Sequence, residues 1–122
     1  MNPNEPMGTE ARADLLFAAL RSAPSVADQP VVALMQWRVV QLPNRERVLV
    51  GCIEGSMTLR ITSPIVKTDQ RRLWTMSGRC YEMRYQHATT AEMLELVRLR
   101  LAASGHMYFL DVTEEVLSAL CG

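Results

Sequence analysis

An alternation of apolar and polar residues over residues 57–85 is the feature that most limits what this chain can fold into. It is clearest at residues 57–62, where every second residue is apolar, namely Met57, Leu59 and Ile61. A two-residue period is typical of a β-strand with one buried face. The alternation resumes after a turn at residues 69–71, and Ser77-Gly78 divides the second half into a hairpin. Arginines occupy many of the polar positions, so the region predicts an antiparallel sheet with a basic outer face.

Two further strands are predicted before this region. In residues 31–42, every odd-numbered residue from Val31 to Val39 is apolar, which predicts one buried face, with polar residues near the middle of the other. Residues 47–54 are nearly continuously apolar, which is typical of a central strand covered on both faces. Gly51 in this strand indicates a bulge or a close approach of the backbone to a neighbour.

Helical periods appear at both ends of the chain. After an N-cap at Thr9, residues 10–22 place apolar side chains at helical spacing. The residues after His87 do the same, with a capping box of Thr89 and Glu92 at the start and a stop at Ser104-Gly105. Residues 106–111 predict a short closing strand, which a final short helix follows.

Together these elements predict a single α+β domain over residues 9–122. We expect an antiparallel sheet of about five strands, strongly curved or closing toward a small barrel, with helices at the N-terminus and the C-terminus packed over its apolar face. The length of 122 residues and the hydrophobic content of 48% are enough for one continuous core. Residues 1–8 contain two prolines and little that a core can bury, so they are predicted to be a mobile tail.

Charge is balanced over the whole chain but uneven along it. The chain has 13 basic and 13 acidic residues, which does not fit a nonspecific nucleic-acid binder or an acidic disordered protein. Residues 31–86 contain nine basic and four acidic side chains, and the two flanks carry the opposite excess. A basic sheet between acidic helices would steer an anionic partner onto one face, or would allow a homodimer.

The cysteines and the hydropathy pattern bear on where the protein works. Cys52, Cys80 and Cys121 are far apart, with no paired spacing, which favours reduced thiols. No apolar run approaches the roughly 20 residues that a membrane span needs. The first ten residues lack the charged-then-apolar order of a signal peptide. We therefore expect a cytoplasmic protein with no membrane partner.

No stretch of the sequence carries a catalytic, metal or cofactor signature. His87 and His106 are the only histidines, and neither lies in a sequence context known to activate it. The ligand spacings that zinc uses are absent, as are the glycine-rich phosphate-binding motifs. The sequence therefore predicts a protein that is not an enzyme and that holds no metal and no cofactor.

The basic face of the predicted sheet is the candidate binding site. Guanidinium groups on neighbouring strands hold phosphates or carboxylates, and an aromatic plane among them stacks a base or a sugar. The alternative is a solvated sheet face, on which arginine stems cover apolar surface, with the tryptophan serving as a core anchor. The residues concerned are Arg60, Arg71, Arg72, Trp74, Arg79 and Arg84.

Residues 61–81 resemble a pattern found in small uncharacterised proteins of bacteriophages and prophages. The pattern is a strand that ends in Thr-Ser-Pro-Ile-Val, an acidic turn, and then Thr-x-Ser-Gly-Arg-x-Tyr at the opening of the next strand. It covers about a sixth of the chain. The matching residues are Thr62, Ser63, Pro64, Ile65, Val66, Asp69, Thr75, Ser77, Gly78, Arg79 and Tyr81. The resemblance implies a mobile-element origin, where short compact proteins bind and block host machinery, including nucleic-acid-guided defence complexes.

Two functions follow as expectations. The first is a non-enzymatic binding protein, phage- or prophage-encoded, that inhibits or modulates a host protein or a ribonucleoprotein such as a host-defence complex. The alternative is a protein that binds a nucleic acid or an anionic nucleotide on the arginine-rich sheet face.

Overall fold

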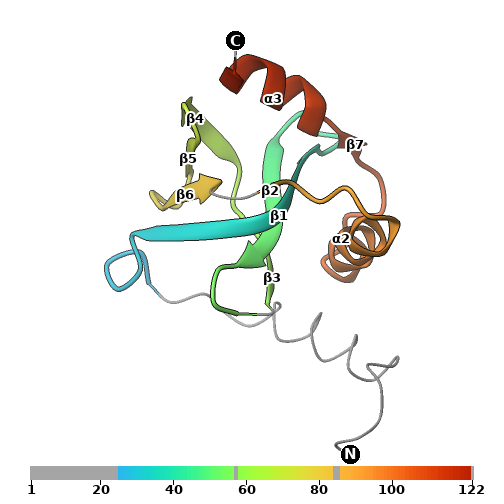
Figure 1. Ribbon diagram of the computed structural model, residues 1–122, viewed down its shortest axis with the longest axis horizontal. Coiled ribbons are helices and arrows are strands. Elements are labelled where there is room, and N and C mark those ends of the chain that lie inside the picture. The colour runs from blue at the N-terminus through green and yellow to red at the C-terminus, as the bar shows by residue number, and fades with distance from the viewer. Residues whose placement is uncertain (1–24, 57, 84–85, 122) are drawn as a thin grey trace, which may run out of the picture.

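The computed structural model describes residues 25–56, 58–83 and 86–121 (Figure 1). The predicted tail at residues 1–8, the predicted helix at residues 10–22, and Met57 and Arg84 lie outside the described residues. The strands are β1 (Val31–Gln41), β2 (Arg47–Ile53), β3 (Leu59–Ile61), β4 (Ile65–Asp69), β5 (Arg72–Thr75), β6 (Cys80–Met83) and β7 (Leu110–Asp111). The helices of the described part are α2 (Ala91–Ala103) and α3 (Thr113–Cys121).

The strands form one sheet in the order β3-β2-β1-β6-β5-β4, and β7 pairs with the end of β1. β1 and β6 run parallel, whereas the other neighbouring strands are antiparallel. The prediction of a mixed α and β architecture is confirmed. However, the sheet that the described residues form has seven strands rather than about five, contains a parallel pair, and is not closed into a barrel.

A short connection forces this open sheet to curl. β3 and β4 are consecutive in the chain but lie at the two ends of the strand order. Residues 62–64 join them, and a connection of that length spans at most about 14 Å. In a flat sheet the two strands would be about 24 Å apart, because neighbouring strands are spaced at about 4.8 Å. The sheet therefore curls until β4 contacts β2.

β1 is the strand on which both halves of the sheet are built. One of its edges pairs with β2 from Leu34 to Gln41. Its other edge changes partner along its length, from β6 to residues 86–88 and then to β7. At the point of exchange, the Gln36 amide donates to the Gln86 carbonyl at 3.1 Å, and the Ala88 amide donates to the Trp37 carbonyl at 3.1 Å.

A β-bulge lies in β1 at this point of exchange. Met35 pairs with Cys52 and Arg38 with Val50, so two residues of β1 stand opposite Gly51 alone. Gln36 takes a left-handed φ of 50°, which a non-glycine residue adopts at a cost. A Cβ on Gly51 would lie 3.0 Å from the Trp37 Cβ, so the predicted close approach is confirmed.

The bulge reverses the side-chain alternation of β1. Val32 and Leu34 before it and Trp37 and Val39 after it share one core cluster. The predicted burial of the odd-numbered residues is therefore wrong before the bulge, where Val31 is 51% exposed, because a single extra residue moves the following side chains to the other face.

Two hydrophobic clusters cover the two faces of β2. The first cluster contains Trp37, Leu49 and residues of β5 and β6, and Val116 and Leu117 of α3 pack against it. The second cluster contains Val48 and Val50 of β2 together with side chains of α2. Figure 1 shows the two helices at separate places around the sheet. The prediction that residues 47–54 form a strand covered on both faces is confirmed.

The helix ends are close to those predicted. The Thr90 hydroxyl, rather than that of Thr89, caps α2 by accepting from the Met93 amide at 3.2 Å. The helix stops at Ser104, and Gly105 follows with a φ of 87°. The predicted closing strand at residues 106–111 is confirmed for its last two residues, which form β7. α3 then begins at Thr113.

Gly51→Ala should destabilise the protein. The added methyl would lie 3.0 Å from the Trp37 Cβ and 3.2 Å from the Met35 carbonyl oxygen, both of which are fixed within the bulge. We expect the free energy of unfolding in urea to fall by about 1–3 kcal/mol. Val66→Ala, at an exposed strand position, is the control and should change it by less than about 0.5 kcal/mol. Equal effects of the two substitutions would contradict this role of Gly51.

Candidate functional site

The structure brings together part of the predicted arginine face. Arg71, Arg72 and Trp74 lie on β5 and on the turn that precedes it, and they line one hollow of about 420 Å³. The strand register places Lys67 of β4 opposite Trp74, and its ammonium nitrogen lies 4.9 Å from the centre of the indole ring. Trp74 is half-buried, so part of its ring remains accessible.

Among the described arginines of the predicted face, Arg60 and Arg79 do not line this hollow. Arg60 lies on β3, and its Nη1 donates to the Gln29 side-chain oxygen at 3.3 Å. Arg79 is 5% exposed, and its Nε donates to the Gln29 carbonyl at 2.8 Å. The guanidinium therefore binds a part-buried carbonyl, and little of the Arg79 side chain is left exposed to a partner. Arg84 lies outside the described residues.

Carboxylates are interleaved with the cations of this face. Arg72 stands opposite Asp69 on β4 and opposite Glu82 on β6, and its Nη2 lies 3.3 Å from the Glu82 Oε1. Cross-strand pairs of opposite charge stabilise a sheet by a few tenths of a kcal/mol, or by about 1 kcal/mol at most. The face is therefore of mixed charge rather than basic.

A second polar cluster joins β1 to the C-terminal helix. The Arg38 Nε lies 2.9 Å from the Asp111 Oδ2, and its Nη1 donates to the Ala88 carbonyl at 2.9 Å. The Glu114 Oε1 lies 3.8 Å from both the Arg38 Nη1 and the His87 Nε2. The centre of the His87 ring lies 5.6 Å from that of the Trp37 ring. These contacts attach the start of the C-terminal helix to β1.

Two effects act on the Asp111 carboxyl in opposite directions. Burial acts to raise its pKa, but hydrogen bonds from Arg38 and Thr113 and the charge of Arg38 outweigh burial and hold the pKa below its ordinary value of 3.8. The Asp111 Oδ1 accepts from the Thr113 amide at 3.0 Å at the start of α3. The carboxylate therefore stabilises both an ion pair and a helix N-terminus.

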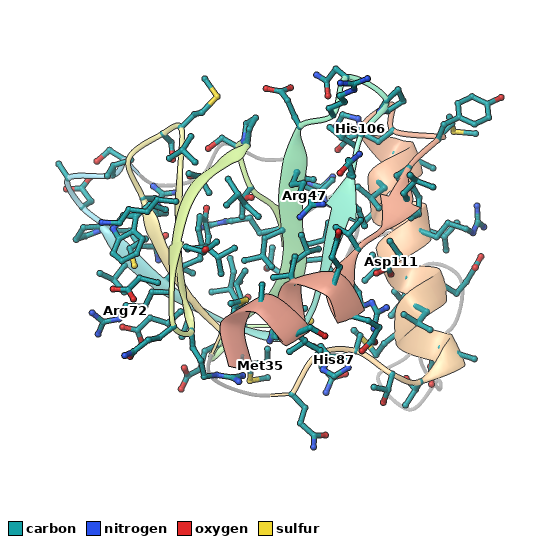
Figure 2. All side chains as sticks on the ribbon, turned by 90° about the horizontal axis from the view of Figure 1, so that it is seen from above. Met35, Arg47, Arg72, His87, His106 and Asp111 are labelled. Atoms are coloured by element: carbon teal, nitrogen blue, oxygen red, sulfur yellow. The ribbon has the colours of Figure 1, made fainter. Side chains whose placement is uncertain are left out.

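An open groove of about 650 Å³ was not predicted from the sequence. Three segments line it: the turn after β1, the middle of α2, and residues 107–110. Leu42, Pro43 and Phe109 contribute to its apolar lining. Beside them, Met107 is 65% exposed, Tyr108 81% and Leu110 65%. Figure 2 shows that this side of the molecule, marked by His106, lies away from Arg72.

The groove differs in charge from three other hollows that described residues line. Its lining contains Arg45 and Arg98 and no carboxylate. Each of these three hollows includes a carboxylate, from Glu54, Asp69 or Glu82. Exposed apolar side chains and a positive rim therefore occur together at this groove.

No family model, curated protein or solved structure matches this chain. The resemblance to phage proteins therefore stays a prediction. Within the described residues, no group of three or more histidines, cysteines or acidic side chains is placed to hold a metal ion. The helices of the same residues are too short or too polar to cross a membrane.

Asp111→Asn should lower stability in a pH-dependent way. The folded pKa of Asp111 is depressed, so its contribution is present above the unfolded pKa and is lost as the pH falls through the folded value. At pH 7 we expect a loss of about 1–2 kcal/mol in the free energy of unfolding. Urea titrations from pH 7 to pH 2.5 should show that the difference in the free energy of unfolding between the variant and the wild type becomes smaller below about pH 4. A gap that does not change with pH would contradict this account.

Proposed function

We propose that this chain is a non-enzymatic binding protein that engages another protein through residues 107–110 and the groove beside them. The observation that carries the proposal is the exposure of Met107, Tyr108 and Leu110 in one short segment next to an apolar hollow. Exposed apolar patches beside polar rims mark interaction sites in many proteins. Tyrosine and methionine are also enriched where protein interfaces are buried.

The fold holds this segment in place at both ends. On one side, the His106 amide donates to the Leu101 carbonyl at 2.8 Å, which ties the segment to the end of α2. On the other side, β7 pairs with β1. A segment fixed in this way loses little conformational freedom on binding, so more of the free energy of apolar burial appears as affinity.

The phage resemblance supports one kind of partner. We propose that the partner is a host protein or a ribonucleoprotein, and that binding inhibits or modulates it by covering part of its surface. A small domain with a fixed apolar segment is suited to this role, because occlusion needs a well-placed contact surface and no chemistry.

Met107→Asp should disrupt the interaction, because a carboxylate would have to be desolvated in an apolar contact. The measurement is photo-crosslinking from a benzoylphenylalanine at position 108, in an extract of cells that carry the gene. We expect the yield of the crosslinked partner to fall at least about tenfold, which corresponds to about 1.4 kcal/mol.

Met76→Asp is the matched control for this experiment. Met76 is 66% exposed, against 65% for Met107, and follows β5, which Figure 1 shows away from β7 and α2. The control should keep the wild-type yield. If both substitutions reduce crosslinking equally, or if position 108 crosslinks to nothing, the proposed binding surface is wrong.

The alternative function, binding of a nucleic acid or an anionic nucleotide, has one observation in its favour. Arg71, Arg72 and Trp74 line a common hollow, with Lys67 over the indole ring. Cations beside an aromatic plane are suited to a phosphate and a stacked base. However, Asp69 lines the same hollow, and Glu82 pairs with Arg72, so an anionic ligand would meet carboxylates there.

Arg72→Ala tests this alternative with a labelled single-stranded oligonucleotide. Because the carboxylates offset the cations, we expect a Kd weaker than about 100 µM at physiological salt and less than a twofold change on substitution. Fluorescence anisotropy at several salt concentrations provides the measurement. Tight binding that falls steeply with salt and with Arg72→Ala would instead favour nucleic-acid binding.

A further inference from the structure

We propose that the groove beside residues 107–110 receives a segment of the partner protein that carries both apolar and acidic side chains. This inference rests on the proposed protein-binding function and specifies the chemistry of the partner. Three features of the groove support it: an apolar lining, an open side that faces solvent, and arginines in the lining.

The apolar lining of the groove is anchored in the core. Leu42 is buried and belongs to the second cluster, and Phe109 packs against the same cluster. Both side chains also line the groove. An apolar anchor that enters the groove therefore meets a surface that is already ordered, which reduces the entropic cost of binding.

The exposure of one wall favours a polypeptide over a small molecule. Pockets for small ligands usually bury about 70–90% of the ligand surface. Here Tyr108 remains 81% exposed and Met107 65% exposed, so much of the apolar surface faces open solvent. A chain segment that lies along the groove and over Tyr108 covers this surface, whereas a small ligand in the groove leaves it in water.

The charge of the groove favours acidic side chains on the partner. Arg45 is exposed on the turn after β1, where its own amide donates to the Leu42 carbonyl at 2.9 Å, and it forms no ion pair within the described residues. Arg98 uses its Nε and Nη2 on Glu95, which leaves other donors of the guanidinium fork available. A carboxylate of a partner can bind Arg45 without meeting an acidic residue of the groove lining, whereas one at Arg98 shares the guanidinium with Glu95.

The same charge pattern favours carboxylates over a phosphate backbone. Proteins that bind single-stranded nucleic acid follow the backbone with a row of cations and stack successive bases on aromatic rings. The groove has two arginines and no lysine, and most of its lining side chains are apolar. This arrangement suits a few carboxylates beside apolar anchors.

A random library of 12-residue peptides, displayed on a carrier and selected on the full protein, tests the proposal. Binders that are retained by the wild type and released by Leu110→Asp should contain aspartate or glutamate together with large apolar residues. A fluorescein-labelled copy of a selected peptide then allows its Kd to be measured by anisotropy. We expect Arg45→Glu to weaken its binding at least about tenfold and Arg98→Gln about threefold.

Lys67→Glu is the matched control, because Lys67 is also an exposed cation but lies on β4, which Figure 1 shows away from α2 and β7. It should change the Kd less than twofold, and thermal melting should show that every variant folds. The proposal is overturned if the selection yields no binder, yields only basic or uncharged peptides, or yields peptides that bind Arg45→Glu as tightly as the wild type. It is also overturned if an oligonucleotide displaces the selected peptide in an Arg45-dependent way.

The two proposals can fail separately. If crosslinking at position 108 captures a partner whose contact segment is not acidic, the proposal of protein binding is supported and the proposal of an acidic partner segment is wrong. If neither crosslinking nor peptide selection depends on residues 107–110, both proposals fall.

Discussion

The close approach of Gly51 to Trp37 is the constraint on which the rest of the structure depends. Without a side chain on Gly51, two residues of β1 fit opposite one residue of β2, and the resulting bulge shifts the alternation of β1 by one position. The shift brings Trp37 onto the same cluster as Leu34, where it is fully buried. It also coincides with the exchange of partners on the other edge of β1, from β6 to residues 86–88. One glycine thus allows a single long strand to serve both halves of a curled sheet.

The exposed segment at residues 107–110 is positioned by the far half of that strand. β7 pairs with the last residues of β1, and the Val112 amide donates to the Val39 carbonyl at 2.9 Å. The Val39 amide in turn donates to the Thr113 hydroxyl at 2.9 Å, inside the buried part of the molecule. These bonds fix the chain immediately after the exposed residues, so the groove is framed by the sheet, by α2 and by the turn after β1. Its shape therefore follows from the register of β1 rather than from any local motif.

Much of the fold could be predicted from local sequence, but the candidate site could not. The alternation at residues 57–62 and the stop at Ser104-Gly105 are local signals, and the strand β3 and the end of α2 follow them. The buried face of β1 was predicted wrongly before the bulge, because the sequence does not show that the extra residue opposite Gly51 lies in β1. The face around Arg72 was predicted to be basic. The pairing of Arg72 with Glu82 could not be foreseen, because it depends on the register between β5 and β6. The groove was missed because it forms where three distant segments meet.

The uneven charge along the sequence has a different meaning in the folded molecule. The excess of basic residues in the middle of the chain predicted a polarised surface, able to steer an anionic partner. In the structure, arginines of β1 and β2 reach acidic residues of the C-terminal flank: Arg38 pairs with Asp111 at 2.9 Å, and Arg47 pairs with Glu115 at 2.7 Å. Some of the basic residues in the middle of the chain therefore attach the C-terminal elements to the sheet through ion pairs. At the groove, Arg98 pairs with Glu95, whereas Arg45 forms no ion pair within the described residues, so its positive charge remains for a partner.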